Sequence, residues 1–323
     1  MNNSSSSREE VVLTENGENY NPINIGIGSV VIKILCCSIG IPLNVSIVVI
    51  LTRLARRLHR KPRYFFLLAI ILSYLSFFIV PVIELIYWGI YQDESLCHAY
   101  VAVIFVPQGL LLVNMLLALI DRYLAINHPL LHREKMTNRL ACCLIVTCSI
   151  LTVFLFKFVY IAGLDILRCE ILLLHVKVAS IVFIILFISC MAMNIVVYRQ
   201  TKILLRESRT VETTRDDGVT ANNHSTVVSP MSIHVGRKKL DQLEMEATRT
   251  LIMGVTSLCV MPCLNVVFSA TFFACRLVFG QSECSNLNGI GSLIKEISLT
   301  PAVYGPIIFH VRNKELREAW ANY

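Results

Sequence analysis

The chain has 323 residues, of which 55% are hydrophobic and only 16% are charged, and its mean hydropathy is +0.65. A soluble domain is typically about 45–50% apolar and about 25% charged. The apolar residues also form long blocks, which excludes a soluble enzyme, a coiled coil and a disordered chain. A helical protein with several membrane spans remains. The net charge of +7 fits basic cytoplasmic loops, and we expect no nucleic-acid partner.

Seven apolar blocks are long enough to cross a bilayer, for which about 20 residues are needed. We expect each to be a helix, because an open sheet edge cannot face lipid. The predicted fold class is therefore an all-α membrane protein, a seven-transmembrane helix bundle. The blocks lie at residues 25–51, 64–91, 98–120, 140–161, 171–198, 250–274 and 287–309.

Three regions follow from this pattern: an outer tail at 1–24, a membrane domain at 25–309 and a C-terminal segment at 310–323. Residues 199–249 are polar and are predicted to form a flexible cytoplasmic loop within the membrane domain. Lys and Arg gather on the side of this loop, so the N-terminus should lie outside and the chain should reside in the plasma membrane. Asn2 and Asn3 each open a glycosylation sequon on the outer tail.

The residues Asp121-Arg122-Tyr123 stand at the cytoplasmic end of span three, within the string LLALIDRYLAINHPLLHREKMT. Asp121 can hold the guanidinium of Arg122 in a charge-assisted pair, and its release would free Arg122 to donate to the carbonyl end of a partner helix. The extended string resembles the rhodopsin-like (class A) family of G-protein-coupled receptors. The resemblance implies an extracellular ligand, a heterotrimeric G-protein partner, and a Tyr198 that meets Arg122 on activation.

Functions of another class find little support. The chain contains no Gly-x-Ser-x-Gly, no His-Glu-x-x-His and no membrane-embedded Asp pair, so we expect no enzyme, no cofactor and no metal site. A channel or transporter remains the alternative. It is disfavoured because no internal repeat is visible and because spans three and six are nearly continuous apolar runs.

The resemblance also implies disulfides on the outer side. Cys97 begins span three, twenty-five residues before Arg122, which is the family's spacing for one half of a disulfide. Its partner would be Cys169, the one cysteine of the second outer loop. Cys275 and Cys284 flank the third outer loop and are a second candidate pair, with free thiols as the alternative.

Several landmarks of the family are altered in this chain. Asn44 takes the position of the span-one asparagine, but Tyr74 replaces the span-two acid. The family's sodium site would therefore lack its carboxylate. In span six the motif is Cys259-Val260-Met261-Pro262, so Val260 replaces a tryptophan, and Pro262 should still kink the helix.

Span seven offers two registers for the family's Asn-Pro-x-x-Tyr motif. One is Thr300-Pro301-Ala302-Val303-Tyr304, and the other is Gly305-Pro306-Ile307-Ile308-Phe309. We prefer the second, because Arg312-Asn313-Lys314-Glu315 then follows directly and looks like the junction of odorant receptors. Apolar residues after it fall on one face, which predicts a short amphipathic helix on the inner membrane surface.

Further strings resemble odorant receptors. Pro62-Arg63-Tyr64-Phe65-Phe66-Leu67 opens span two, and Asn127-His128-Pro129-Leu130 follows span three. They favour an odorant-like, chemosensory receptor for a small molecule. The short outer loop after span four and the long cytoplasmic loop depart from that group, and they leave a peptide or lipid receptor as the alternative. Ser and Thr residues in that loop predict possible arrestin recruitment.

Ionisable residues inside spans are functional candidates. We expect Glu84, and Lys295 or Glu296, to face the bundle interior as structural or ligand-pocket residues, and Glu84 and Lys295 could pair. Lys33, Lys157 and Lys177 lie nearer the outer ends, where snorkelling is expected. Amine receptors carry an acid at the position of Ile104, so an amine ligand is disfavoured. The ligand pocket should instead be lined by Ile104, Phe105 and Gln108.

Overall fold

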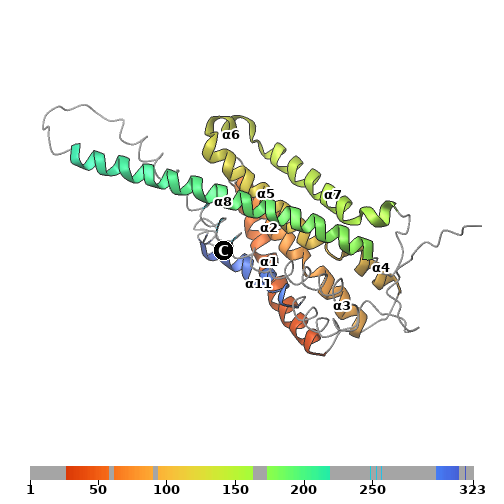
Figure 1. The fold of residues 1–323 in the computed structure, drawn as a ribbon. Coiled ribbons are helices and arrows are strands. Elements are labelled where there is room, and N and C mark those ends of the chain that lie inside the picture. Colours follow the sequence, from red (N-terminus) through yellow and green to blue (C-terminus); the bar gives the residue numbers. More distant parts are fainter. Residues whose placement is uncertain are drawn as a thin grey trace, which may run out of the picture.

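A computed structural model describes residues 27–57, 62–89, 94–162, 173–218 and 296–312, and the single positions Thr248, Ile252, Thr256 and Arg317. In this part of the chain the regular structure is entirely helical (Figure 1). The helices are α1 (Ile27–Arg57), α2 (Arg63–Ser76), α3 (Ile79–Gly89), α4 (Glu94–Val103), α5 (Val106–Asn127), α6 (Pro129–Lys135), α7 (Asn138–Ala162), α8 (Leu173–Gly218) and α11 (Pro301–Arg312).

Five helical segments are long and apolar enough to cross a membrane, and they correspond to the first five predicted spans. The shorter apolar helix Pro301–Val311 is the inner end of predicted span seven. Most of span six, and most of the predicted amphipathic helix after span seven, lie outside the described residues. The five segments are Ile27–Arg53, Arg63–Gly89, Ser95–Asn127, Asn138–Ala162 and Val178–Ile203.

Spans two and three are each interrupted, and a proline explains both interruptions. Proline lacks an N–H group and clashes with the carbonyl four residues earlier. Pro81 disturbs the helix at Phe77, where α2 gives way to α3, and Pro107 disturbs it at Val103, where α4 ends. The third span is thus not the continuous helix that its apolar run suggests, and the interruption leaves the carbonyls of Val101 and Ile104 open to a side-chain donor.

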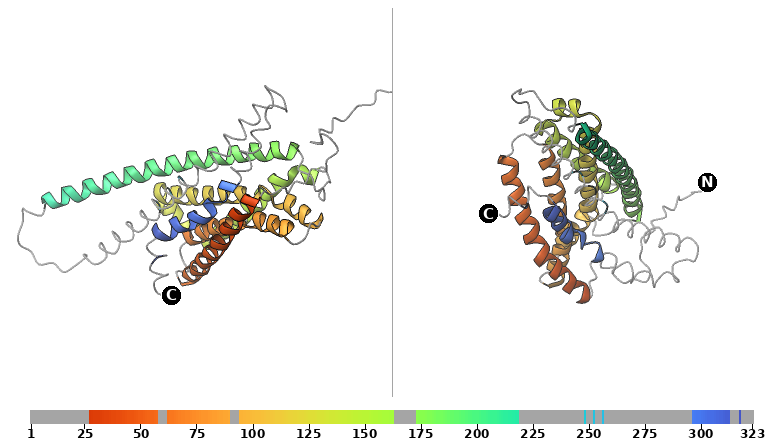
Figure 2. Two further views of the ribbon diagram at one scale, coloured as in Figure 1. Left: turned by 90° about the horizontal axis from the view of Figure 1, so that it is seen from below. Right: turned by 90° about the vertical axis from the view of Figure 1, so that its left-hand side faces the viewer.

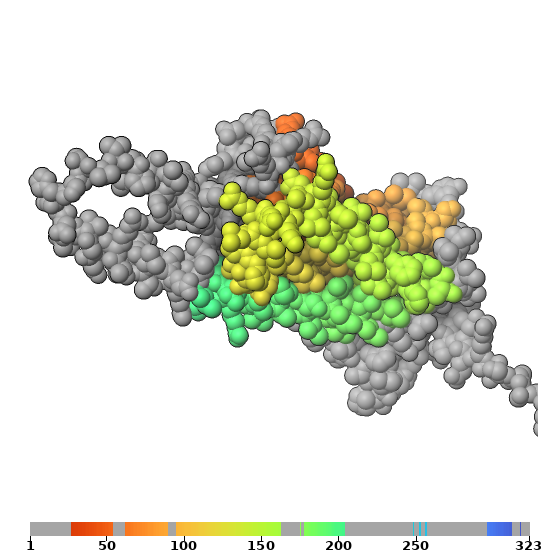
Figure 3. Space-filling model, turned by 90° about the horizontal axis from the view of Figure 1, so that it is seen from above, coloured from red at the N-terminus to blue at the C-terminus, as the bar shows by residue number. Residues whose placement is uncertain are grey.

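Helix α5 lies at the centre of the bundle and contacts α2, α7 and α8, while α1 contacts α2, α3 and α11. The views from two sides show α1 and α11 adjacent, with α8 along another side (Figure 2). Large buried side chains from α2 and α5, including Tyr64, Tyr74 and Met115, fill the interior. Helices α7 and α8 form adjoining parts of one outer face (Figure 3), and their exposed Ile, Val, Leu and Phe side chains suit contact with lipid.

Helix α8 continues far beyond the predicted end of span five at residue 198. It runs to Gly218 and projects past the rest of the bundle (Figure 1), so the first part of the predicted flexible loop 199–249 is helical. That prediction was wrong for residues 199–218. The physical reason is local: this stretch has no proline and no glycine before Gly218, and it contains the strong helix formers Leu, Lys, Arg and Glu.

Candidate functional site

The predicted G-protein contact lies near the end of α5. Asp121 and Arg122 are both buried, at 1% and 8% exposure. Arg122 Nη2 lies 3.1 Å from Asp121 Oδ2, which is the charge-assisted pair that the sequence predicted. The guanidinium is therefore held near the C-terminal end of the third span. Tyr123, the third residue of the motif, is partly buried against the main apolar core.

A second group binds Asp121, and sequence reasoning missed it. His132 lies on α6, the short helix after α5, and its Nε2 is 2.9 Å from Asp121 Oδ1. Since an ionised carboxylate only accepts, the imidazole is the donor. Pro129 at the start of α6 has a φ that suits a helix, and the helix that follows brings His132 back to Asp121, which lies eleven residues earlier in the chain. The carboxylate thereby joins α6 to α5.

Tyr198 does not share this site in the present conformation. It lies on α8 and is 52% exposed, so its side chain is not packed into the interior with Arg122. The predicted meeting of these two residues would require α8 or α5 to move.

At mid-membrane, Asn44 joins the first span to the seventh. Its side chain is completely buried, and its Nδ2 donates to the carbonyl of Gly40 at 2.8 Å and to the carbonyl of Ala302 at 2.9 Å. The second contact crosses from α1 to α11. A nearby side-chain contact joins the second and third spans, since Asn114 donates to Ser73 Oγ at 2.8 Å.

Tyr74 faces Gly305 at the position where the family's acid would stand. A Cβ atom added at Gly305 would lie 2.7 Å from Cζ and 2.8 Å from Oη of Tyr74. Only a residue without a side chain leaves room for this ring. The contact is the one expected from the second register of the span-seven motif, Gly305-Pro306-Ile307-Ile308-Phe309. In that register Pro306 lies inside α11 and Phe309 is buried.

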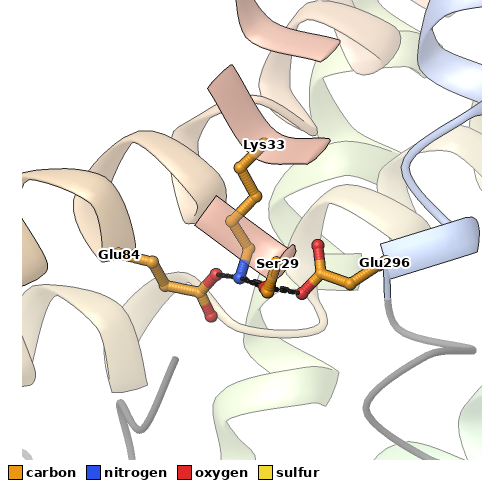
Figure 4. Close-up of polar contacts among 4 residues, drawn as sticks. All are labelled: Ser29, Lys33, Glu84 and Glu296. Carbon is orange, nitrogen blue, oxygen red and sulfur yellow. Dashed lines mark hydrogen bonds and ion pairs between the residues drawn. The ribbon is translucent and has the colours of Figure 1, made fainter. Parts of the chain in front are cut away.

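In the half of the bundle that is predicted to be outer, one lysine lies between two glutamates (Figure 4). Lys33 Nζ is 2.9 Å from Glu84 Oε2 and 2.8 Å from Glu296 Oε1. It also donates to Ser29 Oγ at 2.7 Å, and that hydroxyl donates to Glu296 Oε1. We call these four residues the outer cluster. They connect α1, α3 and the turn that precedes α11.

The outer cluster corrects one expectation. Lys33 was expected to snorkel to the membrane surface, but it is 3% exposed because two carboxylates compensate the burial of its charge. Glu84 contacts Lys33 in the structure, and because Lys295 lies outside the described residues, the pair of Glu84 with Lys295 stays a prediction. The interior placement of Glu84 and Glu296 is confirmed by their exposures of 1% and 7%.

The predicted pocket residues lie at the break between α4 and α5. Ile104 and Phe105 form the connection, and Phe105 has a positive φ of 70°, the left-handed region. Lys157 of α7 donates to the freed carbonyls of Val101 at 2.7 Å and Ile104 at 3.2 Å. Its expected snorkelling was therefore wrong. Gln108 is the third residue of α5 and is half-buried.

Several predicted residues cannot be placed. Cys97 is buried and disulfide-bonded, but Cys169 lies outside the described residues, so their pairing stays a prediction. The structure of the remaining predicted positions is not described either. These are Asn2, Asn3, Cys259, Val260, Pro262, Cys275 and Cys284, and the side chain of Lys177.

Comparison with known proteins identifies the family. The family model described as "7 transmembrane receptor (rhodopsin family)" matches residues 43–309. The chain belongs to this family of receptors. It is therefore a multi-pass membrane receptor of the G-protein-coupled type, and not an enzyme. The crystal structure of squid rhodopsin has the same fold, with a TM-score of 0.66 and 18% identity over 91% of this chain and 84% of that one. A search of curated proteins finds no match.

Proposed function

We propose that this receptor is chemosensory and of the odorant type. It lies in the plasma membrane with its N-terminus outside, binds a small extracellular molecule in the outer half of the bundle, and activates a heterotrimeric G protein at the inner end. The pairs Cys97–Cys169 and Cys275–Cys284 close the outer loops, and Asn2 and Asn3 carry glycans.

The observation that carries the coupling step is the state of Arg122. Its guanidinium is buried beside Asp121 at the cytoplasmic end of α5, and the same carboxylate binds His132. A conformational change that separates the guanidinium from Asp121 would free its N–H groups. Once released, its N–H groups suit the exposed carbonyls at the end of a partner helix.

Support for the odorant type comes from the strings at the starts and ends of spans two, three and seven and from the predicted pocket. Ile104 occupies the position at which amine receptors carry an acid, and the neighbouring Phe105 is aromatic. Such a pocket suits a small, mainly apolar molecule more than a peptide, which needs many polar contacts.

The test is expression of the full chain with a promiscuous G protein, followed by screening of odorant, peptide and lipid panels. We expect responses confined to the odorant panel and abolished by Arg122→Ala at unchanged surface expression. Arg139→Ala, at an exposed position on the same side, is the matched control and should retain the response. Responses to peptides or lipids alone would overturn the odorant assignment, and a full response from Arg122→Ala would overturn the coupling role.

A further inference from the structure

A histidine in the outer half of the bundle is buried without a hydrogen bond. His175 lies near the start of α8 and is 0% exposed. Neither Nδ1 nor Nε2 has a hydrogen-bond partner among the residues that the structure describes. A buried polar group without a partner is costly, and its presence in a native site calls for a ligand or a water. The function of the two nitrogens is thus not explained by the fold.

Aromatic rings enclose this imidazole. The ring of Tyr160 on α7 has its centroid 4.6 Å away, and the ring of Phe105 at the α4–α5 break lies at 5.8 Å. Phe105 and Tyr160 therefore bring His175 to the break in the third span. Gln108, one turn further along α5, also has a buried Oε1 atom without a partner in the described residues.

A cation lies against the same tyrosine. Lys157 Nζ is 5.7 Å from the Tyr160 ring centroid, and it donates to the carbonyls of Val101 and Ile104. An ammonium has three N–H donors, so two backbone contacts leave one N–H for another acceptor. Within the described residues no carboxylate forms an ion pair with Lys157. Capping of the broken helix explains its two contacts but leaves the positive charge uncompensated.

Apolar rings lie next to this polar pair. Phe156 precedes Lys157 on α7 and is completely buried, and its ring packs edge-on against Phe183 of α8 at 5.9 Å. The Phe156 ring also lies where a side chain at Gly109 of α5 would stand. The region between α5, α7 and α8 therefore combines a cationic, hydrogen-bonding end with an aromatic, apolar end.

We propose that Lys157 and His175 form a subsite for the carboxylate of a small amphiphilic ligand, whose apolar part lies against Phe105 and the Phe156–Phe183 pair. A carboxylate carries a single negative charge and only accepts hydrogen bonds, which suits one ammonium and one imidazole N–H. A phosphate, with a charge of about −1.5 to −2, would need more cations, and an amine would be repelled by Lys157. The inference rests on the proposed function, since it names the ligand class of that receptor.

The experiment measures binding directly, so that it does not depend on G-protein coupling. Thermal unfolding of the purified full chain is followed with increasing butanoate, hexanoate and octanoate, and with hexanol, methyl hexanoate and hexylamine. We expect saturable stabilisation by at least one carboxylate and by none of the other probes. Because a hydrogen bond to a charged group is strong, Lys157→Gln and His175→Phe should each weaken carboxylate binding about tenfold or more.

Two exposed positions provide matched controls, Lys202→Gln and His128→Phe, and both should bind like the wild type. Lys157→Gln also removes a helix cap, so His175→Phe, which keeps an aromatic ring, gives the independent test if the first variant does not fold. Equal stabilisation by hexanol, unchanged binding in His175→Phe, or no stabilisation by any carboxylate would each overturn the proposal. If the carboxylate binds as expected but no nucleotide exchange follows, the subsite stands and the coupling assignment fails.

Discussion

At the scale of single residues, Tyr74 and Gly305 depend on each other. The tyrosine ring occupies the space that a side chain at position 305 would need, with the closest approach at 2.7 Å from the added Cβ atom. Both residues depart from the family's landmarks, and the departure at one position makes room for that at the other. An aromatic ring thus fills a place where an acid would bind sodium, so we expect agonist affinity to be insensitive to sodium.

The Gly305→Ala variant should reveal this dependence. The added methyl group forces the buried Tyr74 ring to move, and overpacking of this kind typically costs about 1–3 kcal/mol. We expect a lower midpoint of thermal unfolding for the purified receptor. Gly28→Ala is the control, because a Cβ atom there meets nothing within 4 Å. In a double-mutant cycle, the loss of stability caused by Gly305→Ala should be smaller in the Tyr74→Ala background than in the wild type. Strict additivity of the two changes would contradict the dependence.

His132 is expected to restrain the resting state. Its Nε2 donates to Oδ1 of Asp121 while Oδ2 of the same carboxylate holds Arg122, so it fixes the orientation of the carboxylate. His132→Phe leaves a buried acceptor unsatisfied and should weaken the restraint by about 1 kcal/mol, which is several-fold in the active population. The measurement is agonist-free nucleotide exchange per surface receptor. His128→Phe, at an exposed position, should change nothing. An unchanged or lower rate in His132→Phe would refute the restraint.

At the scale of helices, the apolar blocks predicted the spans well, because crossing a bilayer imposes a length and a composition that a single sequence displays. The breaks at Phe77 and Ile104 follow from Pro81 and Pro107 and were open to the same reasoning. The burial of Lys33 could not be predicted in this way, since periodicity within α1 does not tell which acids of other helices lie opposite. His132 was missed for the same reason: its contact depends on the turn between α5 and α6.

The outer cluster should be a large contribution to the packing of α1 against α3 and α11. Lys33→Met would remove the cation that lies between the buried Glu84 and Glu296, and removing one partner of a buried ion pair typically costs about 3–5 kcal/mol. We expect low surface expression and a lower unfolding midpoint. Lys202→Met, at an exposed lysine, is the matched control.

A compensated variant separates charge from packing in this cluster. Adding Glu84→Gln and Glu296→Gln to Lys33→Met removes the two carboxylates that contact Lys33, so most of the lost stability should return. If the triple variant is no more stable than Lys33→Met alone, the loss comes from packing of the lysine stem. Wild-type stability of the single variant would show that the cluster does not hold these helices together.

At the scale of the whole molecule, polar contacts join the helices at several depths along the bundle. The outer cluster and Asn44 join α1 to the seventh span in the outer half and at mid-membrane. The third span takes part in both the proposed ligand subsite and the proposed G-protein contact. Lys157 of α7 binds the backbone at its break, and Asp121 and Arg122 lie near its other end. Because α5 contacts α2, α7 and α8, a ligand that shifts α5 would change the packing of Arg122. The ligand subsite and Arg122 would then be coupled through α5 alone, without a chain of contacts through other helices.

We expect regulation to act on residues 199–249, which comprise the end of α8 and the segment after it. Residues 199–249 contain several Ser and Thr residues, so arrestin recruitment should depend on phosphates there, each adding a charge of about −1.5 to −2. Truncation after Trp320 should leave agonist-induced arrestin recruitment intact, while alanine at seven positions should abolish it at normal surface expression. Loss of recruitment on truncation, with full recruitment by the alanine variant, would reverse this assignment. The seven positions are Ser208, Thr210, Thr213 and Thr214 within the bounds of α8, and Ser225, Thr226 and Ser229 after it.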